Sequence, residues 1–318
     1  AKFSEWRSLQ VLSIFQNSLT GTLPTELGAW ISLESLEVDQ NFLTGTVPTE
    51  LGLMTGMTWL DIYHNAFSGT LPTELGLLTK LTLLALDENS LVGMLPTELG
   101  QLTALWRLSF STNSFTGPLP TELGKLTDLE KFYSYSNNLT GTLPTELAMW
   151  SGIKRFSAYE NGIWGRLPTE LLGAWSTLDS FSISTNNLSG SLPTELGQLL
   201  AMTNLDLGKN SLNGTLPTEL GQLTALTALS LLINNFSGTI PTELGKLNGL
   251  TFLAVSANQL NGTTPTELGR LTALELLSTE SNHLTGNIPT ELGQLSMMTS
   301  LRVHNNRLTG TLPTEIGA

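Results

Sequence analysis

The feature that most constrains this chain is a short motif, Leu-Pro-Thr-Glu-Leu-Gly, which begins at Leu23 and returns in close variants along all 318 residues. The motif prolines are Pro24, Pro48, Pro72, Pro96, Pro120, Pro144, Pro168, Pro193, Pro217, Pro241, Pro265, Pro289 and Pro313. Eleven of the twelve intervals are 24 residues long and one, from Pro168 to Pro193, is 25. A fixed period of this length predicts a solenoid, in which each repeat packs only on its neighbours. We therefore expect one domain over residues 1–318, with about 13 repeats.

The first half of each repeat predicts a strand that buries one face. In the repeat from Leu81 to Gly100, Leu81, Leu84 and Leu86 have the spacing L-x-x-L-x-L. The last two alternate as they would in a half-buried strand. Asn89 follows at the turn, and an Asn stands seven residues before every motif proline. Because an amide group both donates and accepts, stacked Asn side chains can satisfy the backbone of these turns.

The second half of each repeat predicts a tight bend and a short helical turn. Gly93 allows the bend because glycine has no Cβ. Pro96 suits the first position of the turn, where its missing N–H has no cost. Glu98 falls in the first turn, where unpaired backbone N–H groups stabilise a carboxylate. Gly100 is expected to end the turn.

The full pattern L-x-x-L-x-L-x-x-N-x-L-x-G-x-L-P-x-x-L-G resembles the plant-type leucine-rich repeats of receptor-kinase ectodomains and polygalacturonase-inhibitor-like proteins. The fixed Pro-Thr-Glu-Leu-Gly segment resembles repeats that are abundant in diatoms and related algae. The resemblance implies an α/β solenoid, a curved and twisted superhelix with a parallel concave sheet and short convex 3-10 or helical turns. The chain departs from the plant proteins because it has no cysteine, and therefore lacks the paired cysteines of their caps. No terminal cap is recognisable.

Charge and composition exclude several function classes. The net charge is −13, but the 13 motif glutamates account for it: 27 acids minus 13 leaves 14, which equals the 14 Lys and Arg. Without a basic stripe, we expect no nucleic-acid partner. The absence of cysteine removes disulfides, zinc–thiolate sites and thiol catalysis. No apolar run reaches the roughly 18 residues that a membrane span needs.

No motif for catalysis or metal binding is present. The chain has no G-x-S-x-G elbow, no phosphate-binding loop and no H-E-x-x-H. Its three histidines, His64, His283 and His304, lie in repeats three, twelve and thirteen, so they cannot share one metal. His64 beside Asp61 and Asp87 is the one acid–base grouping, and a solvated surface explains it better. We therefore expect no enzyme activity and no cofactor or metal.

Tyrosine and basic residues gather on the positions expected to face the concave side. These positions lie 13, 11, 9 and 8 residues before each motif proline, and all four tyrosines occupy them. We predict a ligand-binding surface formed by Tyr63, Arg107, Lys131, Tyr133, Tyr135, Arg155 and Tyr159. Tyr and Arg often anchor interfaces, and aromatic faces beside basic groups suit carbohydrate or acidic peptide ligands. The alternative is that strand propensity alone favours tyrosine there.

The character of the same face changes along the chain. Repeats two to four are acidic, with Glu37, Asp39, Asp61, Asp87 and Glu88. Repeats ten and eleven are apolar, and Leu232, Ile233 and Phe252 form a candidate partner patch, because contiguous exposed apolar surface marks interaction sites. Trp30, Trp150 and Trp175 occupy a slot usually held by Leu, so we expect them to pack in the core. The one extra residue lies between Glu170 and Trp175, in a segment expected to be a convex loop.

Five N-glycosylation sequons occur, at Asn138, Asn187, Asn213, Asn235 and Asn261. The repeat pattern itself generates such sequons, so each of them alone is a weak signal. Together with the family resemblance they favour a secreted or cell-surface protein.

Two function classes remain open. The first is a non-catalytic extracellular recognition module that binds a protein, peptide or glycan on its concave face. The second is a structural, adhesive or self-assembling protein that uses the Thr-Glu pairs repeated from Thr25 to Glu315. Those glutamates serve either as helix-start charges or as a cation-binding stripe, although one carboxylate per repeat is too sparse for a calcium cage. Ice binding through the Thr column is a variant of the second class, which neighbouring Glu side chains and solenoid curvature oppose.

Overall fold

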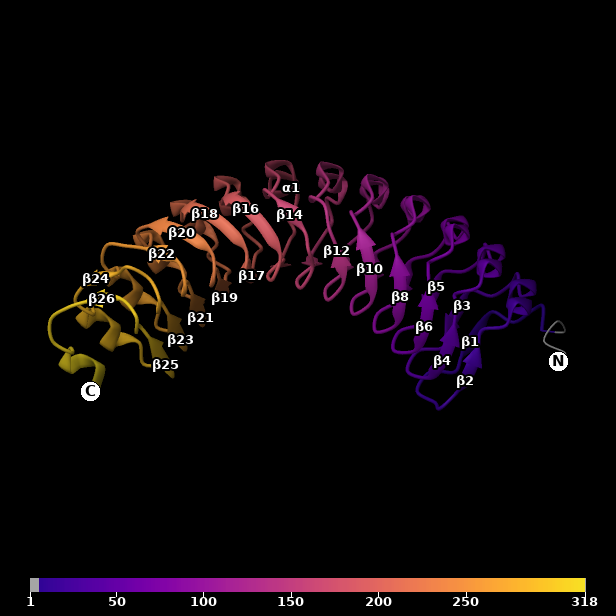
Figure 1. Ribbon diagram of the computed structural model, residues 1–318, viewed down its shortest axis with the longest axis horizontal. Coiled ribbons are helices and arrows are strands. Elements are labelled where there is room, and N and C mark those ends of the chain that lie inside the picture. Colours follow the sequence, from indigo (N-terminus) through magenta and orange to yellow (C-terminus); the bar gives the residue numbers. More distant parts are fainter. Residues whose placement is uncertain (1–5, 318) are drawn as a thin grey trace. The chain divides into compact units, whose positions relative to one another are not determined.

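The computed structural model describes residues 6–317 of the chain. It divides into two compact units, Ala1–Ile163 and Trp164–Ala318. Both units are built from the same coil, which contains a strand of a main sheet, a strand of a lateral sheet and a short helical turn (Figure 1). Within each unit the coils curve toward the main sheet, which therefore carries the predicted concave face. The single-domain organisation stays a prediction.

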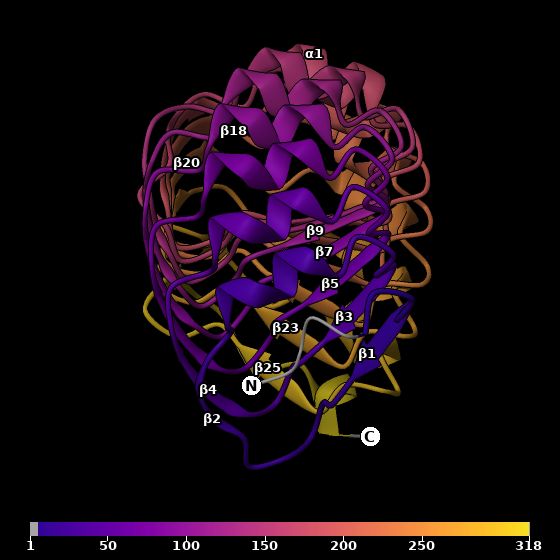
Figure 2. The ribbon, with the colours of Figure 1, turned by 90° about the vertical axis from the view of Figure 1, so that its right-hand side faces the viewer.

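In the first unit the strands of the main sheet pair in parallel, each with its counterpart one repeat away. They are β1 (Val11–Ser13), β3 (Ser35–Glu37), β5 (Trp59–Asp61), β7 (Leu83–Ala85), β9 (Arg107–Ser109), β11 (Lys131–Tyr133) and β13 (Arg155–Ser157). The lateral sheet contains β2 (Thr20–Thr22), β4 (Phe42–Gly45), β6 (Ala66–Gly69), β8 (Ser90–Gly93), β10 (Ser114–Gly117) and β12 (Asn138–Leu139). The 3-10 turns are η2 (Thr25–Ala29), η3 (Thr49–Leu53), η4 (Thr73–Leu77), η5 (Thr97–Gln101), η6 (Thr121–Lys125) and η7 (Thr145–Met149). Figure 2 views this end of the chain and shows the two sheets on opposite sides, joined by the stacked turns.

The second unit repeats this arrangement. Its main-sheet strands are β15 (Ser180–Ser182), β17 (Asn204–Asp206), β19 (Ala228–Ser230), β21 (Phe252–Ala254), β23 (Leu276–Ser278) and β25 (Ser300–Arg302). One lateral sheet contains β14 (Trp164–Gly165), β16 (Asn187–Ser191), β18 (Ser211–Thr215), β20 (Asn235–Gly238) and β22 (Gln259–Leu260), and another pairs β24 (Thr285–Gly286) with β26 (Arg307–Leu308). The turns are α1 (Thr169–Ala174), η8 (Thr194–Gln198), η9 (Thr218–Gln222), η10 (Thr242–Lys246), η11 (Thr266–Arg270), η12 (Thr290–Gln294) and η13 (Thr314–Gly317).

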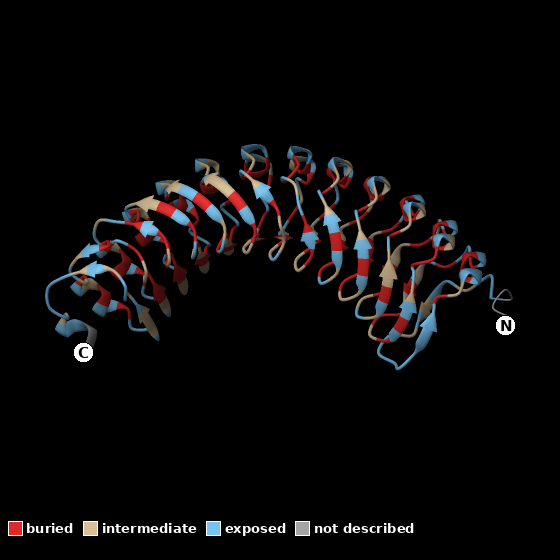
Figure 3. Ribbon diagram, viewed as in Figure 1, coloured by how far each residue is buried: buried red, intermediate tan, exposed pale blue. Residues whose placement is uncertain are grey.

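Leucines from all three sides of the coil fill the core, which Figure 3 shows as buried segments along the inside of each coil. Leu84 and Leu86 from the strand, Leu91 from the lateral sheet and Leu99 from the turn are all fully buried. The predicted alternation is therefore confirmed. Full burial of such a side chain contributes roughly 1.5–3 kcal/mol relative to its exposure, so the stacked leucines supply most of the driving force.

The Asn of each repeat satisfies the backbone of its own turn and of the neighbouring repeat. The side-chain amide of Asn137 donates to the carbonyl oxygens of Ser134 and Tyr135 and, one repeat back, to that of Phe110. Its side-chain oxygen accepts the N–H of Phe115 at 3.0 Å. The predicted role of the stacked asparagines is confirmed, and these bonds join adjacent coils as well as closing turns.

Two predictions about the helical turn are corrected. Pro96 does not take the first helical position, because its backbone is extended (φ −62°, ψ 134°) and η5 begins one residue later. Its carbonyl accepts the first hydrogen bond of the turn, from the N–H of Leu99. Gly100 does not end the turn, which continues to Gln101. Glycine is needed there because a Cβ would lie 2.4 Å from the carbonyl oxygen of Glu122 in the next turn.

Aromatic residues replace leucine in part of the core. Trp30, Trp150 and Trp175 are at most 1% exposed, so their predicted core packing is confirmed. The extra residue lies in α1, where an α-helical turn replaces the 3-10 turn of other repeats, on the predicted side of the coil. The rings of Phe132 and Phe156 stack at 5.2 Å beside Trp150.

Candidate functional site

The predicted basic residues form one row on the main sheet of the first unit. Arg107, Lys131 and Arg155 begin β9, β11 and β13 and are direct partners in the parallel register. We call these three residues the basic row. Since neighbouring strands lie about 4.8 Å apart, the Cα atoms of these residues follow one another at about that interval across the sheet.

Six of the seven predicted binding residues line a single groove of about 600 Å³ in this unit. They are Tyr63, Arg107, Lys131, Tyr133, Tyr135 and Arg155, and the remaining lining residues are Asp39, Gln40, Asp61, Ala85, Asp87 and Glu88. The seventh, Tyr159, stacks on Tyr135 with ring centroids 4.5 Å apart and planes 5° apart. Ala85, in the middle of the face, is small and leaves space for the groove.

Two of the positively charged side chains form cation–π contacts with aromatic rings. The guanidinium carbon of Arg107 lies 5.5 Å from the ring centroid of Tyr133, and the ammonium of Lys131 lies 5.1 Å from the ring of Trp106. Cation–π contacts of this kind stabilise a charge without neutralising it. The basic side of the groove therefore keeps its positive potential.

Three of the tyrosines, Tyr63, Tyr135 and Tyr159, are neutral phenols at physiological pH. Burial raises the pKa of Tyr63, Tyr135 and Tyr159 above the ordinary value. The carboxylate of Glu88 raises the pKa of Tyr63 further. Each phenol can therefore offer a hydroxyl donor and an apolar ring to a ligand.

Three aspartates on one side of the groove are the main part of the site that the prediction left out. Asp39, Asp61 and Asp87, here called the acidic side, belong to successive repeats. Burial raises the pKa of all three, and that of Asp61 reaches about 6. Their acidic character was visible in the sequence. Their inclusion in the site could have been found by writing the repeats beneath one another, which places Asp61 beside Ala85 and Asp87 beside Ser111.

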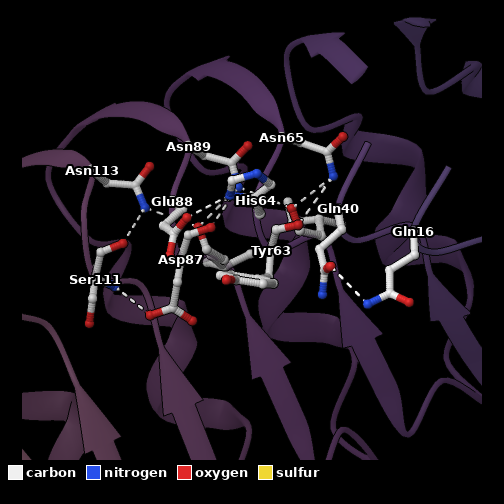
Figure 4. Close-up of polar contacts among 12 residues, drawn as sticks. Gln16, Gln40, Tyr63, His64, Asn65, Asp87, Glu88, Asn89, Ser111 and Asn113 are labelled. Carbon is white, nitrogen blue, oxygen red and sulfur yellow. Dashed lines mark hydrogen bonds and ion pairs between the residues drawn. The ribbon is translucent and has the colours of Figure 1, made fainter. Parts of the chain in front are cut away.

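Backbone N–H groups bind two of these carboxylates. An oxygen of Asp61 accepts the N–H of Tyr63 at 3.1 Å. An oxygen of Asp87, which is only 7% exposed, accepts the N–H of Ser111 at 2.8 Å (Figure 4). Among residues 6–317, no basic side chain forms an ion pair with the acidic side. The carboxylates are thus oriented but not neutralised.

A second polar cluster borders the groove, where Figure 4 shows His64, Tyr63 and Glu88 together. His64 Nδ1 lies 2.5 Å from Glu88 Oε2, and the rings of His64 and Tyr63 are 5.6 Å apart. Glu88, rather than the expected Asp61 or Asp87, is the partner of this histidine. The reason is that His64 and Glu88 occupy equivalent positions after their strands and both have a φ of 50°. Their side chains therefore leave the backbone in the same direction and lie side by side.

The candidate apolar patch lies on the main sheet of the second unit. Leu232, Ile233 and Phe252 line a groove of about 400 Å³ together with Leu276 and polar groups such as Glu280. Ile233 is 48% exposed and has a φ of 54°. The structure thus brings the three predicted residues together, and their role as a partner surface stays a prediction.

All five sequon asparagines are exposed. Asn138, Asn187, Asn213 and Asn235 lie in β12, β16, β18 and β20 of the lateral sheets, and Asn261 directly follows β22. Asn213 and Asn235 are direct partners on adjacent parallel strands.

The Thr-Glu pairs begin the helical turns, as predicted. Within a pair the threonine hydroxyl donates to the following carboxylate, as Thr97 does to Glu98 at 3.3 Å. Over the described part of the chain, no three His, Asp or Glu side chains are arranged to hold a metal ion. None of the helices described is long and apolar enough to cross a membrane.

Comparison with known proteins finds relatives that share the leucine-rich-repeat fold. The family model "Leucine Rich Repeat" matches residues 8–30 and 201–223. No curated protein matches the chain. The algal resemblance of the Pro-Thr-Glu-Leu-Gly segment stays a prediction.

Three solved structures are informative. The plant peptide hormone receptor RGFR1, in complex with RGF2, is 34% identical with a TM-score of 0.97, over 99% of this chain and 50% of the receptor chain. The chain thus spans about half the length of that receptor. The Leptospira interrogans LRR protein LIC12759 is 31% identical with a TM-score of 0.79, over 96% of this chain and 75% of that one. A plant ice-binding protein is 25% identical with a TM-score of 0.65, over 95% of this chain and 82% of that one.

Proposed function

Because this chain belongs to the leucine-rich-repeat family, we propose that it is a non-catalytic recognition module that binds a peptide segment in the groove of the first unit. The observation that carries the proposal is the convergence of six of the seven predicted residues on one groove. Aromatic rings, oriented carboxylates and positive charges occur there together, which suits a peptide better than a neutral glycan. The similarity to a peptide hormone receptor supports the same choice of ligand.

We further propose that the module acts outside the cell, secreted or at the cell surface. The five exposed sequons support this location, because an oligosaccharide can be attached only where the asparagine is accessible. They lie in or beside lateral strands, whereas the groove lies on the main sheet of its unit. A glycan on Asn138, which lies in the lateral sheet of the same unit, would therefore leave the groove free.

The proposal is tested by selecting peptides from a random 12-residue display library against the full chain. Binding should weaken about 30-fold or more in the double variant Tyr135→Ala, Tyr159→Ala, because stacked aromatic anchors dominate interface energies. Leu77→Ala is the matched control, since this exposed side chain lies on the convex turn η4. Selected peptides that bind the double variant as well as the native chain would contradict the proposal.

Ice binding is a second candidate, favoured by the similarity to a plant ice-binding protein. The Thr column of the turns suits this role poorly, because its hydroxyls donate to the adjacent glutamates. The exposed threonines of the lateral sheet suit it better, because Thr22 and Thr44 are direct strand partners and the hydroxyl of Thr44 donates to the carbonyl of Gly21 and not to a charged group.

Ice binding is tested by measuring ice-recrystallisation inhibition by the full chain. Under this candidate, Thr22→Tyr combined with Thr44→Tyr should reduce the inhibition several-fold, because bulky rings break the contact with a regular surface. Glu50→Gln, on the turn η3, is the control. A native chain without inhibition at micromolar concentration would set the candidate aside.

A further inference from the structure

Resting on the proposed peptide-binding function, we propose that the groove of the first unit selects a dipolar peptide. Such a ligand carries a basic side chain that binds the acidic side and, four or five residues away, an acidic side chain that binds the basic row. The peptide then lies across the strands of the main sheet and not along them.

The acidic side is prepared for a cation that the protein itself does not provide. Asp61 and Asp87 each accept a backbone N–H, but no Lys or Arg among residues 6–317 pairs with them. Uncompensated charge in a partly buried site is costly, and burial is the main reason why the pKa of Asp61 reaches about 6. A ligand ammonium or guanidinium would supply the missing opposite charge.

Within the basic row, Arg107 also has an unsatisfied group. Arg107 rests against the ring of Tyr133, and its Nε is buried without a hydrogen-bond partner. Its charge lowers the pKa of Asp61 and Asp87, but it forms no ion pair with either of them. A carboxylate is the group that guanidinium donors bind with the best geometry.

The spacing between the two halves sets the length of the ligand. Asp61 ends β5, whereas Arg107 and Lys131 begin β9 and β11, two and three strands further across the sheet. At about 4.8 Å per strand these separations across the sheet are about 10 and 15 Å. The register places Asp61 two residues, or about 6.6 Å, further along the strands than Arg107, so the direct separations are about 12 and 16 Å. An extended peptide advances about 3.3 Å per residue, so its charges should be four or five residues apart.

The test uses an array of blocked seven-residue peptides of Gly, Ser and Pro that carry one Lys and one Glu. Their separation runs from one to six residues in both orders, and matched peptides replace Lys or Glu with Gln. At 150 mM salt the full chain should bind the peptides with a separation of four or five at least 10-fold more strongly than their Gln counterparts. Peptides with Lys alone control for non-specific attraction to a chain of net charge −13.

Two variants of the protein identify which of its side chains binds the Lys and which binds the Glu of the peptide. Asp61→Asn should lose the preference for Lys and keep that for Glu, and Arg107→Gln should do the reverse. Damage to the fold would weaken both preferences together, so the crossed pattern distinguishes recognition from stability. Native chain should also lose its preference for Lys between pH 7.5 and pH 5, as Asp61 becomes protonated among its charged neighbours Glu37, Asp39, Asp87 and Arg107.

Other outcomes overturn the inference. Equal binding of the Gln counterparts, a preference for two like charges, or unchanged Lys selectivity in Asp61→Asn would each do so. If peptides still bind in a way that requires Tyr135, the recognition function stands while the dipolar ligand fails. If no peptide binds in a Tyr135-dependent way, the proposed function fails as well.

Discussion

At the scale of single residues, each coil contains one strained position at the edge of the main-sheet face. Thirteen described residues other than glycine have φ between 50 and 57°, one in each repeat, and they include Gln40, His64, Glu88 and Ile233. Left-handed backbone costs a non-glycine residue about 1 kcal/mol or more, and a β-branched residue pays most. A backbone bond to the next coil, such as that from the N–H of His64 to the carbonyl of Asp87, holds the conformation. Five of these strained residues line one or the other of the two grooves: Gln40, Glu88, Ile233, Ala257 and Ser281.

The charge of Asp61 should destabilise the free protein. Its folded pKa of about 6 exceeds the ordinary 3.8, so the folded state favours the protonated form. The cost of the charge is absent below pH 3.8 and complete above pH 6. Asp61→Asn should therefore stabilise the chain by about 1–2 kcal/mol at pH 7.5, after allowance for partial solvent exposure, and by almost nothing at pH 3.5.

Urea denaturation at the two pH values checks this expectation. The exposed Asp128→Asn serves as the control for the loss of one carboxylate. A variant at Asp61 that gained stability at pH 3.5 but not at pH 7.5 would reverse the predicted sign. Charge retained at this cost is consistent with a ligand that neutralises it.

The sequence predicted the position of individual residues on the main sheet wherever the repeat period alone determines that position. Counting back from the prolines placed all four tyrosines and the basic row on the main-sheet face. It did not reveal that His64 pairs with Glu88, because the direction of those side chains depends on the left-handed backbone after each strand. It also did not show how deeply Asp87 is buried, which depends on neighbours in other coils.

At the scale of elements, the closeness of the turns is the strictest packing requirement. In η5 a Cβ on Gly100 would lie 2.4 Å from the carbonyl oxygen of Glu122 and 2.8 Å from its Cβ. Neither atom can move without displacing the neighbouring turn. The motif glycine is therefore explained by a contact between repeats, which a pattern within one repeat cannot express.

Gly100→Ala should destabilise the chain by about 1–3 kcal/mol, the usual cost of overpacking. Gly152→Ala is the matched control, because a Cβ there meets no atom within 4 Å. Chemical denaturation should show a lower midpoint for the first variant and an unchanged one for the second. Equal midpoints would mean that adjacent turns do not approach as closely as described.

The other elements were largely predictable. Strands, bends and turns follow from the alternation of leucines and from the fixed glycine and proline, since each repeat has the same local preferences. The α-helical turn α1 was not predicted as such, because the sequence shows that a residue is added but not which hydrogen-bond pattern absorbs it.

At the scale of the whole chain, the lateral sheets carry the candidate glycans. Asn213 and Asn235 are partners on adjacent strands, so their side chains start about 4.8 Å apart. Two branched oligosaccharides would crowd each other at that distance. We expect that secretion from a eukaryotic host yields molecules modified at one of the two sites but seldom at both.

Glycopeptide mass spectrometry measures this occupancy. Asn213→Gln should raise occupancy at Asn235, whereas Asn187, whose strand partner is Trp164, should not respond. Full modification of both partner sites on the same molecule would refute the crowding argument. Absence of glycan at all five sites would instead count against an extracellular location.

Because equal coils stack in parallel, the distance between the acidic side and the basic row depends on the number of repeats between them. Deleting the repeat that contains β7 would bring Asp61 one strand closer to Arg107 and remove Asp87, whereas duplicating it would add about 4.8 Å. Gain or loss of a repeat, a common change in tandem arrays, would therefore alter the preferred ligand by between one and two residues. The number of strands between the acidic side and the basic row therefore sets the charge spacing of the preferred ligand. This number can change without any substitution in the core.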